Sequence, residues 1–157
     1  MRTSVLLLLA VVLLCGCYRP ALTDIPPGTV YIEGLRNKTF YYGLDEKLNH
    51  KLADAVNRTG QLRIVNEPSS SDYVLGGTIQ SVYKDVIRTG EDDLPLEYSY
   101  RCVMQITFEG ENAPARSFEM TRSWRYIPPY GETQESVLDR LTTYLAEEIA
   151  RALVTSW

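Results

Sequence analysis

Residues 97–109 read EYSYRCVMQITFE, and apolar and polar side chains alternate along this stretch. Every second residue is apolar, and the residues between them are mainly polar or charged. The apolar set is Tyr98, Tyr100, Cys102, Met104, Ile106 and Phe108, and the polar set is Ser99, Arg101, Gln105 and Thr107. Successive side chains of a strand point to opposite faces. This period of two therefore predicts a β-strand with one buried face and one solvated face.

Similar segments lie on both sides of this stretch, at residues 72–88 and 116–126. The first is predicted to bury Tyr73, Leu75, Ile79, Tyr83 and Ile87 and to expose Thr78, Gln80, Lys84 and Arg88. The second is predicted to bury Phe118, Met120, Trp124 and Tyr126 and to expose Ser117, Thr121, Ser123 and Arg125. Residues 89–96 and 110–115 contain the glycine, proline and asparagine typical of turns, so the three strands are expected to be joined as hairpins. Two shorter strands are predicted at residues 29–35 and 61–66.

Two segments show the spacing of amphipathic helices. Residues 44–58 carry an apolar stripe of Leu44, Leu48, Leu52, Ala55 and Val56, and Gly60 is a natural stop just beyond them. Residues 133–154 carry a second stripe, which consists of Val137, Leu138, Leu141, Tyr144, Leu145, Ile149 and Leu153. Two such helices can cover one face of a sheet. We therefore predict an α+β two-layer sandwich. Its mostly antiparallel sheet of four to five strands has both helices on one face, and the other face is open.

The first sixteen residues have the features of an export signal. Arg2 supplies a positive charge, residues 5–14 are ten apolar residues, and Cys15-Gly16-Cys17 follows. Ten residues of helix span only about 15 Å, which is too short to cross a bilayer. Residues 14–17 resemble the lipobox of bacterial lipoproteins, which predicts cleavage after Gly16 and a lipid thioether on Cys17. An ordinary secreted protein with two incidental cysteines is the alternative.

The predicted cut divides the chain into a signal (1–16), a lipidated tether (17–28) and a single α+β domain (29–157). Tyr18 follows the cysteine in place of the aspartate that resembles an inner-membrane retention signal, so we expect anchoring in the outer membrane, facing the periplasm. The tether contains three prolines.

Composition excludes several functional classes. The chain has 16 basic and 20 acidic residues, and removing residues 1–16 takes away one arginine, which leaves a net charge near −5. This argues against a nucleic-acid-binding protein. After loss of Cys15 and acylation of Cys17, Cys102 has no partner for an internal disulfide. With one histidine, His50, and no metal-ligand spacing or phosphate-binding glycine loop, we expect no enzyme activity, no cofactor and no metal.

The open face carries the candidate binding residues. Lys84, Arg88, Arg101 and Arg125 are predicted to lie there among hydroxyl side chains, namely Thr78, Ser99, Thr107, Thr121 and Ser123. Guanidinium groups bind phosphate with two parallel hydrogen bonds, so this face could hold the head group of a phosphorylated glycolipid. Ordinary solvated side chains are the alternative.

Several motifs resemble the lipopolysaccharide-assembly lipoproteins, the LptE-like family. Residues 37–40 (NKTF) and 43–44 (GL) are similar to the family's Asn-x-Thr and Gly-Leu-Glu opening of the first helix, with Asp45 in place of the glutamate. Residues 62–65 (LRIV) resemble its next strand. Residues 71–79 (SDYVLGGTI) resemble its Ala-Asp-x-Val-Leu-x-Gly-x-Ile stretch, with Ser71 in place of the alanine. A last helix ending near a tryptophan, here Trp157, is similar too.

The resemblance implies a non-enzymatic outer-membrane lipoprotein. Family members sit in the lumen of a large outer-membrane β-barrel, plug it and assist its assembly, and the two proteins deliver lipopolysaccharide to the outer leaflet. The implied partners are therefore the barrel, lipopolysaccharide and the membrane that holds the lipid anchor. The strand motif with Asp72 is also similar to outer-membrane lipoproteins that activate peptidoglycan synthases, which is the alternative function.

Overall fold

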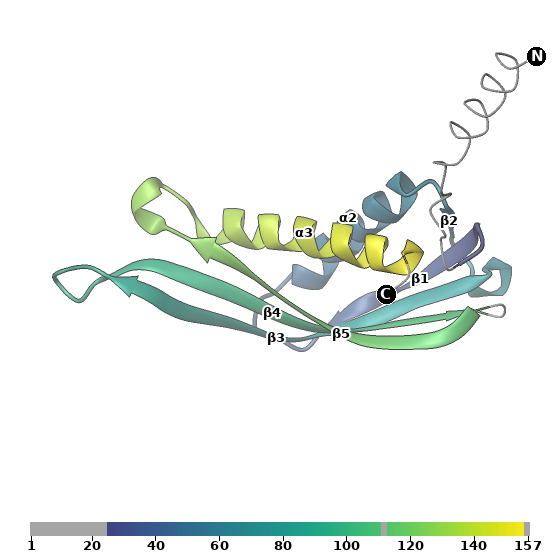
Figure 1. The fold of residues 1–157 in the computed structure, drawn as a ribbon, viewed down its shortest axis with the longest axis horizontal. Coiled ribbons are helices and arrows are strands. Elements are labelled where there is room, and N and C mark those ends of the chain that lie inside the picture. Colours follow the sequence, from purple (N-terminus) through teal and green to yellow (C-terminus); the bar gives the residue numbers. More distant parts are fainter. Residues whose placement is uncertain (1–24, 111–112, 156–157) are drawn as a thin grey trace, which may run out of the picture.

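The computed structural model describes residues 25–110 and 113–155. These residues form a five-stranded sheet with two helices on one of its faces (Figure 1). The predicted α+β two-layer sandwich is confirmed. The predicted signal, Cys17 and Trp157 lie outside the described residues. No helix in the described part of the chain combines the length and hydropathy needed to cross a bilayer.

The sheet is mixed, with strand order β2-β1-β3-β4-β5. The strands are β1 (Gly28–Asn37), β2 (Leu62–Val65), β3 (Tyr73–Thr89), β4 (Pro95–Gly110) and β5 (Ala113–Tyr126). β1 runs parallel to both β2 and β3, whereas the three long strands β3, β4 and β5 are antiparallel hairpins as predicted. Ile25, within the expected tether, is buried in the core. The folded domain therefore begins before residue 29.

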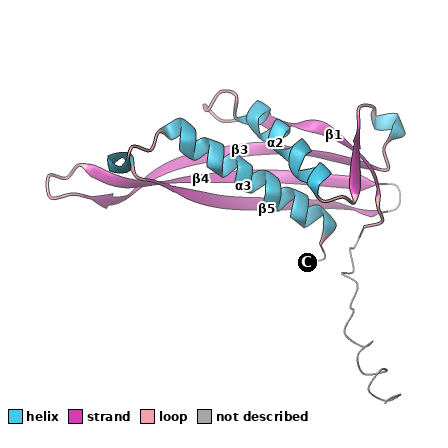
Figure 2. Cartoon of the chain, turned by 90° about the horizontal axis from the view of Figure 1, so that it is seen from above, coloured by secondary structure: helices cyan, strands magenta, loops and turns pink. Residues whose placement is uncertain are grey.

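The two helices lie side by side over the sheet (Figure 2). Helix α2 (Leu44–Arg58) buries the predicted stripe and covers β1 and β2, and α3 (Gln134–Val154) covers β4 and β5. Thr133 caps α3, because its hydroxyl accepts a hydrogen bond from Ser136 N at 3.1 Å. Tyr144 was predicted to be buried, but 40% of it is exposed. It lies at the margin of α3, where its ring packs edge-on against Trp124.

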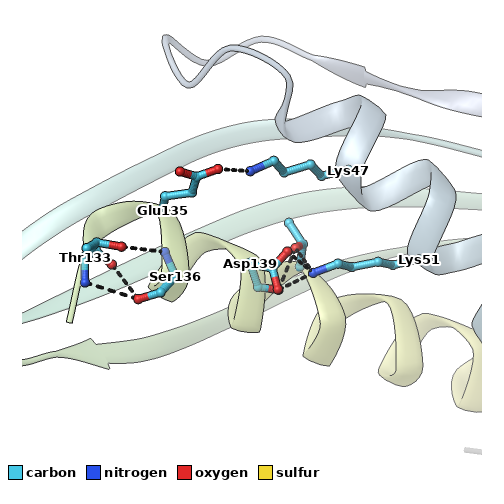
Figure 3. Close-up of polar contacts among 7 residues, drawn as sticks. Lys47, Lys51, Thr133, Glu135, Ser136 and Asp139 are labelled. Carbon is cyan, nitrogen blue, oxygen red and sulfur yellow. Dashed lines mark hydrogen bonds and ion pairs between the residues drawn. The ribbon is translucent and has the colours of Figure 1, made fainter. Parts of the chain in front are cut away.

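Ion pairs hold the helices in a parallel arrangement. Lys47 Nζ lies 3.0 Å from Glu135 Oε1, and Lys51 Nζ lies 2.6 Å from Asp139 Oδ1 (Figure 3). Lys51 also donates to the hydroxyls of Thr142 and Thr143 at 3.1 and 2.8 Å. Both pairs join the N-terminal halves of the helices, so α2 and α3 begin at the same end of the molecule.

The core lies between the helices and the even-numbered face of β4. Tyr100, Met104, Ile106 and Phe108 are fully buried, as the alternation predicts. The backbones of β3 and β4 also approach closely at Gly77 of β3. A Cβ added there would lie 2.6 Å from the carbonyl oxygen of Gln105. Only glycine allows the two backbones to approach in this way.

The prediction of faces was wrong for three residues in the second half of β3, namely Tyr83, Lys84 and Ile87. The pairing of β3 with β4 is regular up to Ile79–Met104, then skips one residue and resumes at Ser81–Val103. This β-bulge at Gln80 reverses which side chains face the helices. Val82 packs against the core, whereas Tyr83, which was expected to be buried, is 52% exposed. Ile87, also expected to be buried, is exposed after a second shift of register between Val86 and Arg88.

β3 and β4 extend well beyond the end of β1. The pairing of β1 with β3 ends at Asn37–Ile79, so the outer edge of residues 81–89 has no neighbouring strand among the described residues. The end of this hairpin projects past both helices in the two views (Figures 1 and 2).

Asp72 joins the start of β3 to the start of β1. Its Oδ2 accepts hydrogen bonds from the backbone N and the hydroxyl of Thr29, both at 2.7 Å. The hydrogen bond from the Thr29 backbone is the largest cause that lowers the pKa of the Asp72 carboxyl, and the bond from the Thr29 hydroxyl is the next. The motif that resembles the family at residues 71–79 therefore has a structural function at this point.

We expect Asp72→Asn to lower the melting temperature at neutral pH. The pKa of Asp72 is lower in the folded chain than in the unfolded chain, where it is about 4. The ionised carboxylate therefore stabilises the fold at any pH above the unfolded-state pKa. This contribution is lost as the pH falls through the folded-state pKa. Thermal unfolding at several pH values should therefore show a difference between wild type and variant that narrows in acid. A difference that is constant with pH would contradict this role.

Candidate functional site

His50 and Cys102 are the side chains of the described residues that nucleophilic catalysis would most readily use. His50 is exposed on α2, and no group of three His, Cys, Asp or Glu side chains that could hold a metal ion occurs in the described ranges. Cys102 is buried, and burial raises the pKa of its thiol to about 12. A thiol with such a pKa remains protonated at physiological pH and is a poor nucleophile. This agrees with the prediction that Cys102 is a small apolar core residue.

Arg101 lies on the open face of the sheet, as predicted. Its Nη2 lies 2.6 Å from Asp85 Oδ2 on the neighbouring strand β3, and both side chains are about half exposed. The guanidinium carbon also lies 5.7 Å from the centre of the Tyr83 ring. Tyr83 is the cross-strand partner of Arg101, and Asp85 is two residues farther along β3. Arg101 is therefore held by a carboxylate and an aromatic ring.

Arg88 and Arg125 share one carboxylate on the same face. Glu97 Oε2 lies 3.6 Å from Arg88 Nε, and Glu97 Oε1 lies 3.4 Å from Arg125 Nε. Glu97 pairs directly with Arg88 across the hairpin, and Arg125 pairs with Ser99, two residues from Glu97. Glu97 is only 9% exposed, and its Oε1 has no hydrogen-bond partner in the described structure. Arg88 and Arg125 therefore flank a carboxylate that is itself almost buried.

Lys84 lies on the opposite, helix-facing side, so the prediction that it belongs to the open face was wrong. It pairs with buried Tyr100 across β3 and β4, because the bulge at Gln80 has reversed the alternation. Its Nζ lies over three tyrosine rings, 4.0 Å from the centre of Tyr98, 5.5 Å from that of Tyr126 and 5.7 Å from that of Tyr100. This is the geometry of a cation–π interaction. Burial raises the pKa of Tyr100 to about 12, so its ring stays neutral.

The structure therefore brings together three of the four predicted cations, namely Arg88, Arg101 and Arg125. It adds Asp85 and Glu97, which the sequence analysis did not select. Glu97 could have been found, because it has the same parity as Arg101 on the strictly alternating strand β4. Asp85 could not, because its face depends on the bulge. These three arginines and two carboxylates form a nearly balanced cluster instead of a purely cationic one.

Comparisons with known proteins agree with this architecture. Residues 28–156 match the model of a family described as LptE, lipopolysaccharide-assembly. The chain belongs to the LptE family. The match begins at the first residue of β1 and extends through α3, so it includes every strand and helix of the described domain. No curated protein matches the sequence.

Solved structures show the same fold at low sequence identity. Protein XCC0632 from Xanthomonas campestris is 11% identical with a TM-score of 0.56, over 87% of this LptE-family chain and 88% of its own. An uncharacterised lipoprotein B from Nitrosomonas europaea is 12% identical with a TM-score of 0.55, and the match covers 88% of this chain and 90% of that protein. A PelC dodecamer variant from Paraburkholderia phytofirmans is 16% identical with a TM-score of 0.52, and the match covers 88% of this chain and 96% of that protein. At these identities the likeness concerns the fold alone.

We expect Lys84→Met to destabilise this LptE-family chain by about 1 kcal/mol, because the variant keeps the aliphatic stem but loses the charge above the tyrosine rings. Chemical denaturation measures the change. In a Tyr98→Leu background the same substitution should cost less, since the nearest ring is then absent. Equal losses in both backgrounds would contradict the contact between Lys84 and Tyr98.

Proposed function

We propose that this LptE-family chain is a non-enzymatic outer-membrane lipoprotein that plugs a β-barrel lipopolysaccharide translocon and assists its assembly. In this role it helps to deliver lipopolysaccharide to the outer leaflet. The observation that carries the proposal is the match of the lipopolysaccharide-assembly family over residues 28–156. Membership of the family supports a role in lipopolysaccharide assembly in general, and the specific function as a plug is our proposal.

The shape and surface of the domain are compatible with this role. Two helices cover one side of the sheet, so the other side is left to polar and charged residues that can meet a polar wall. The interior of a large barrel is such a wall. A lipid on Cys17 would hold the domain at the inner leaflet of the outer membrane and raise its effective concentration near a barrel in that membrane.

Co-purification of the full-length, lipidated chain tests the function. A C-terminal tag and mild detergent should recover a large β-barrel protein in stoichiometric amount. Labelled palmitate should enter the wild type but not Cys17→Ser, and that variant should recover much less barrel. Recovery of a peptidoglycan synthase in place of a barrel would overturn the proposal in favour of a cell-wall activator.

We further propose that the open face contacts the phosphorylated head group of lipopolysaccharide through Arg88, Arg101 and Arg125. Guanidinium groups can bind phosphate oxygens in pairs. In the absence of ligand, Asp85 and Glu97 neutralise these arginines at distances of 2.6 to 3.6 Å. A bound phosphate would therefore have to displace the two carboxylates, and this competition lowers the affinity for phosphate. The same carboxylates hold the arginine side chains in position before the phosphate binds.

The competition between carboxylate and phosphate gives a two-directional test with purified lipopolysaccharide. Replacing both Arg101 and Arg125 by alanine should weaken binding at least about tenfold, because one charged hydrogen bond contributes about 1.5–3 kcal/mol and tenfold corresponds to about 1.4 kcal/mol. Glu97→Gln should strengthen binding, since it releases two arginines from their shared carboxylate.

Lys84→Ala is the matched control, because it removes a cation from the same hairpin but from the opposite face. Its affinity should stay within about twofold of the wild type, after allowance for any loss of stability. Unchanged affinity in the double arginine variant, or an equal loss with Lys84→Ala, would remove this contact from the proposal.

A further inference from the structure

The loop between β1 and α2 exposes two large aromatic side chains almost completely. Phe40 is 95% exposed and Tyr42 is 96% exposed, more than the other large apolar side chains in the described residues. Exposed apolar side chains that gather in one place are typical of contact sites, and Phe40 and Tyr42 line the same hollow. The arginines of the open face belong to a different part of the sheet, on β3, β4 and β5.

Hydrogen bonds within the loop fix its backbone. Asn37 Oδ1 accepts from the backbone N and the hydroxyl of Thr39 at 2.9 and 2.8 Å, and Asn37 Nδ2 donates to the carbonyl of Tyr41 at 2.8 Å. Lys38 N donates to Ile79 O at 3.0 Å, which ties the loop to β3. A loop that is already ordered loses little conformational entropy when its exposed side chains bind a partner.

Tyr41 fixes the direction of its two neighbours. It packs against the core, with its ring edge-on to that of Tyr100 at a centroid distance of 6.1 Å. Phe40 and Tyr42 on either side are almost fully exposed. The sequence from 40 to 42 therefore has one inward anchor and two outward aromatic groups.

A hollow lies beside these side chains. It has a volume of about 470 Å³ and is lined by the aromatic loop and the first turns of both helices, namely Phe40, Tyr41, Tyr42, Leu44, Lys47, Gln134, Glu135 and Leu138. The ion pair between Lys47 and Glu135 crosses from α2 to α3 at this end (Figure 3). The surface thus combines two projecting aromatic groups, a recess and a polar border, which are the parts of a protein-binding hot spot.

The position of the loop argues for a protein occupant. The described chain starts at Ile25, beside the first residues of β1, whereas the loop follows the last residue of that ten-residue strand. The loop is therefore about 30 Å from the end to which the lipidated segment is joined. Only the seven residues 18–24 separate the predicted lipid on Cys17 from Ile25. A lipid on Cys17 would therefore join the membrane to the end of β1 that is opposite the loop.

We propose that Phe40 and Tyr42 are the aromatic anchors by which this chain docks onto a partner protein. They fill an apolar pocket on that protein, and the hollow beside them receives one of its side chains. This inference rests on the proposed function, in which the partner is the barrel of the translocon, and it names the surface that contacts the barrel.

Photocrosslinking in the full-length lipidated protein tests the contact. p-Benzoylphenylalanine at position 40 should form an adduct with the barrel. The same probe at Tyr144, a partly exposed ring at the margin of α3 and away from the open face, serves as the matched position and should form less. The variant with both Phe40→Ala and Tyr42→Ala should recover about tenfold less barrel than the wild type. Its melting temperature should be unchanged, because both side chains are already in solvent.

The outcomes separate this inference from the proposed function. If the wild type recovers no barrel, the proposed function fails. If the wild type and the double alanine variant recover the barrel equally, the function stands and the docking surface is wrong. Adducts from position 40 with lipid only, or with a second copy of the chain, also overturn the docking surface.

Discussion

The buried face of β4 is the surface on which the rest of the domain is assembled. The even-numbered side chains of β4 are packed under the helix layer. The strand itself pairs with β3 along one edge and with β5 along the other. Burial of one large apolar side chain contributes about 1.5–3 kcal/mol, so the row of five buried side chains decides the register of both neighbouring strands. A slip of one residue would expose this row to water and bury Arg101. The core therefore selects one register, and the open face follows from it.

The β-bulge at Gln80 then separates two functions of the same hairpin. Before the bulge, β3 supplies Leu75 and Ile79 to the core. After it, Val82 and Lys84 face the helices, and Tyr83 and Asp85 face solvent. As a result the lysine reinforces a tyrosine cluster, and the aspartate reaches Arg101. A single extra residue converts an expected row of cations into a surface of arginine–carboxylate pairs.

The open face of the sheet and the aromatic loop, the two proposed contact surfaces, differ in character and position. The open face is polar, and its arginines are occupied by their own acids, so a phosphorylated ligand must compete for them. The loop at residues 38–43 is aromatic and already rigid, and it lies at the far end of β1 from the start of the domain. In the proposed role as a lipid-anchored plug the two kinds of contact have different tasks, because ligand exchange and stable docking demand different affinities.

Local periodicity by itself determined the elements of this protein and their class. The helix at 44–58, the three long strands and the helix ending at Val154 follow from spacings of 3.6 and 2, which depend only on neighbouring residues. The resemblance at residues 37–44 and 71–79 likewise identified the family. Only the tertiary structure decided the parallel pairing of β1 with β3, the face of Lys84 and the sharing of Glu97 by two arginines. Each of these depends on register between distant strands, and one bulged residue changes that register without altering the local pattern on either side of it.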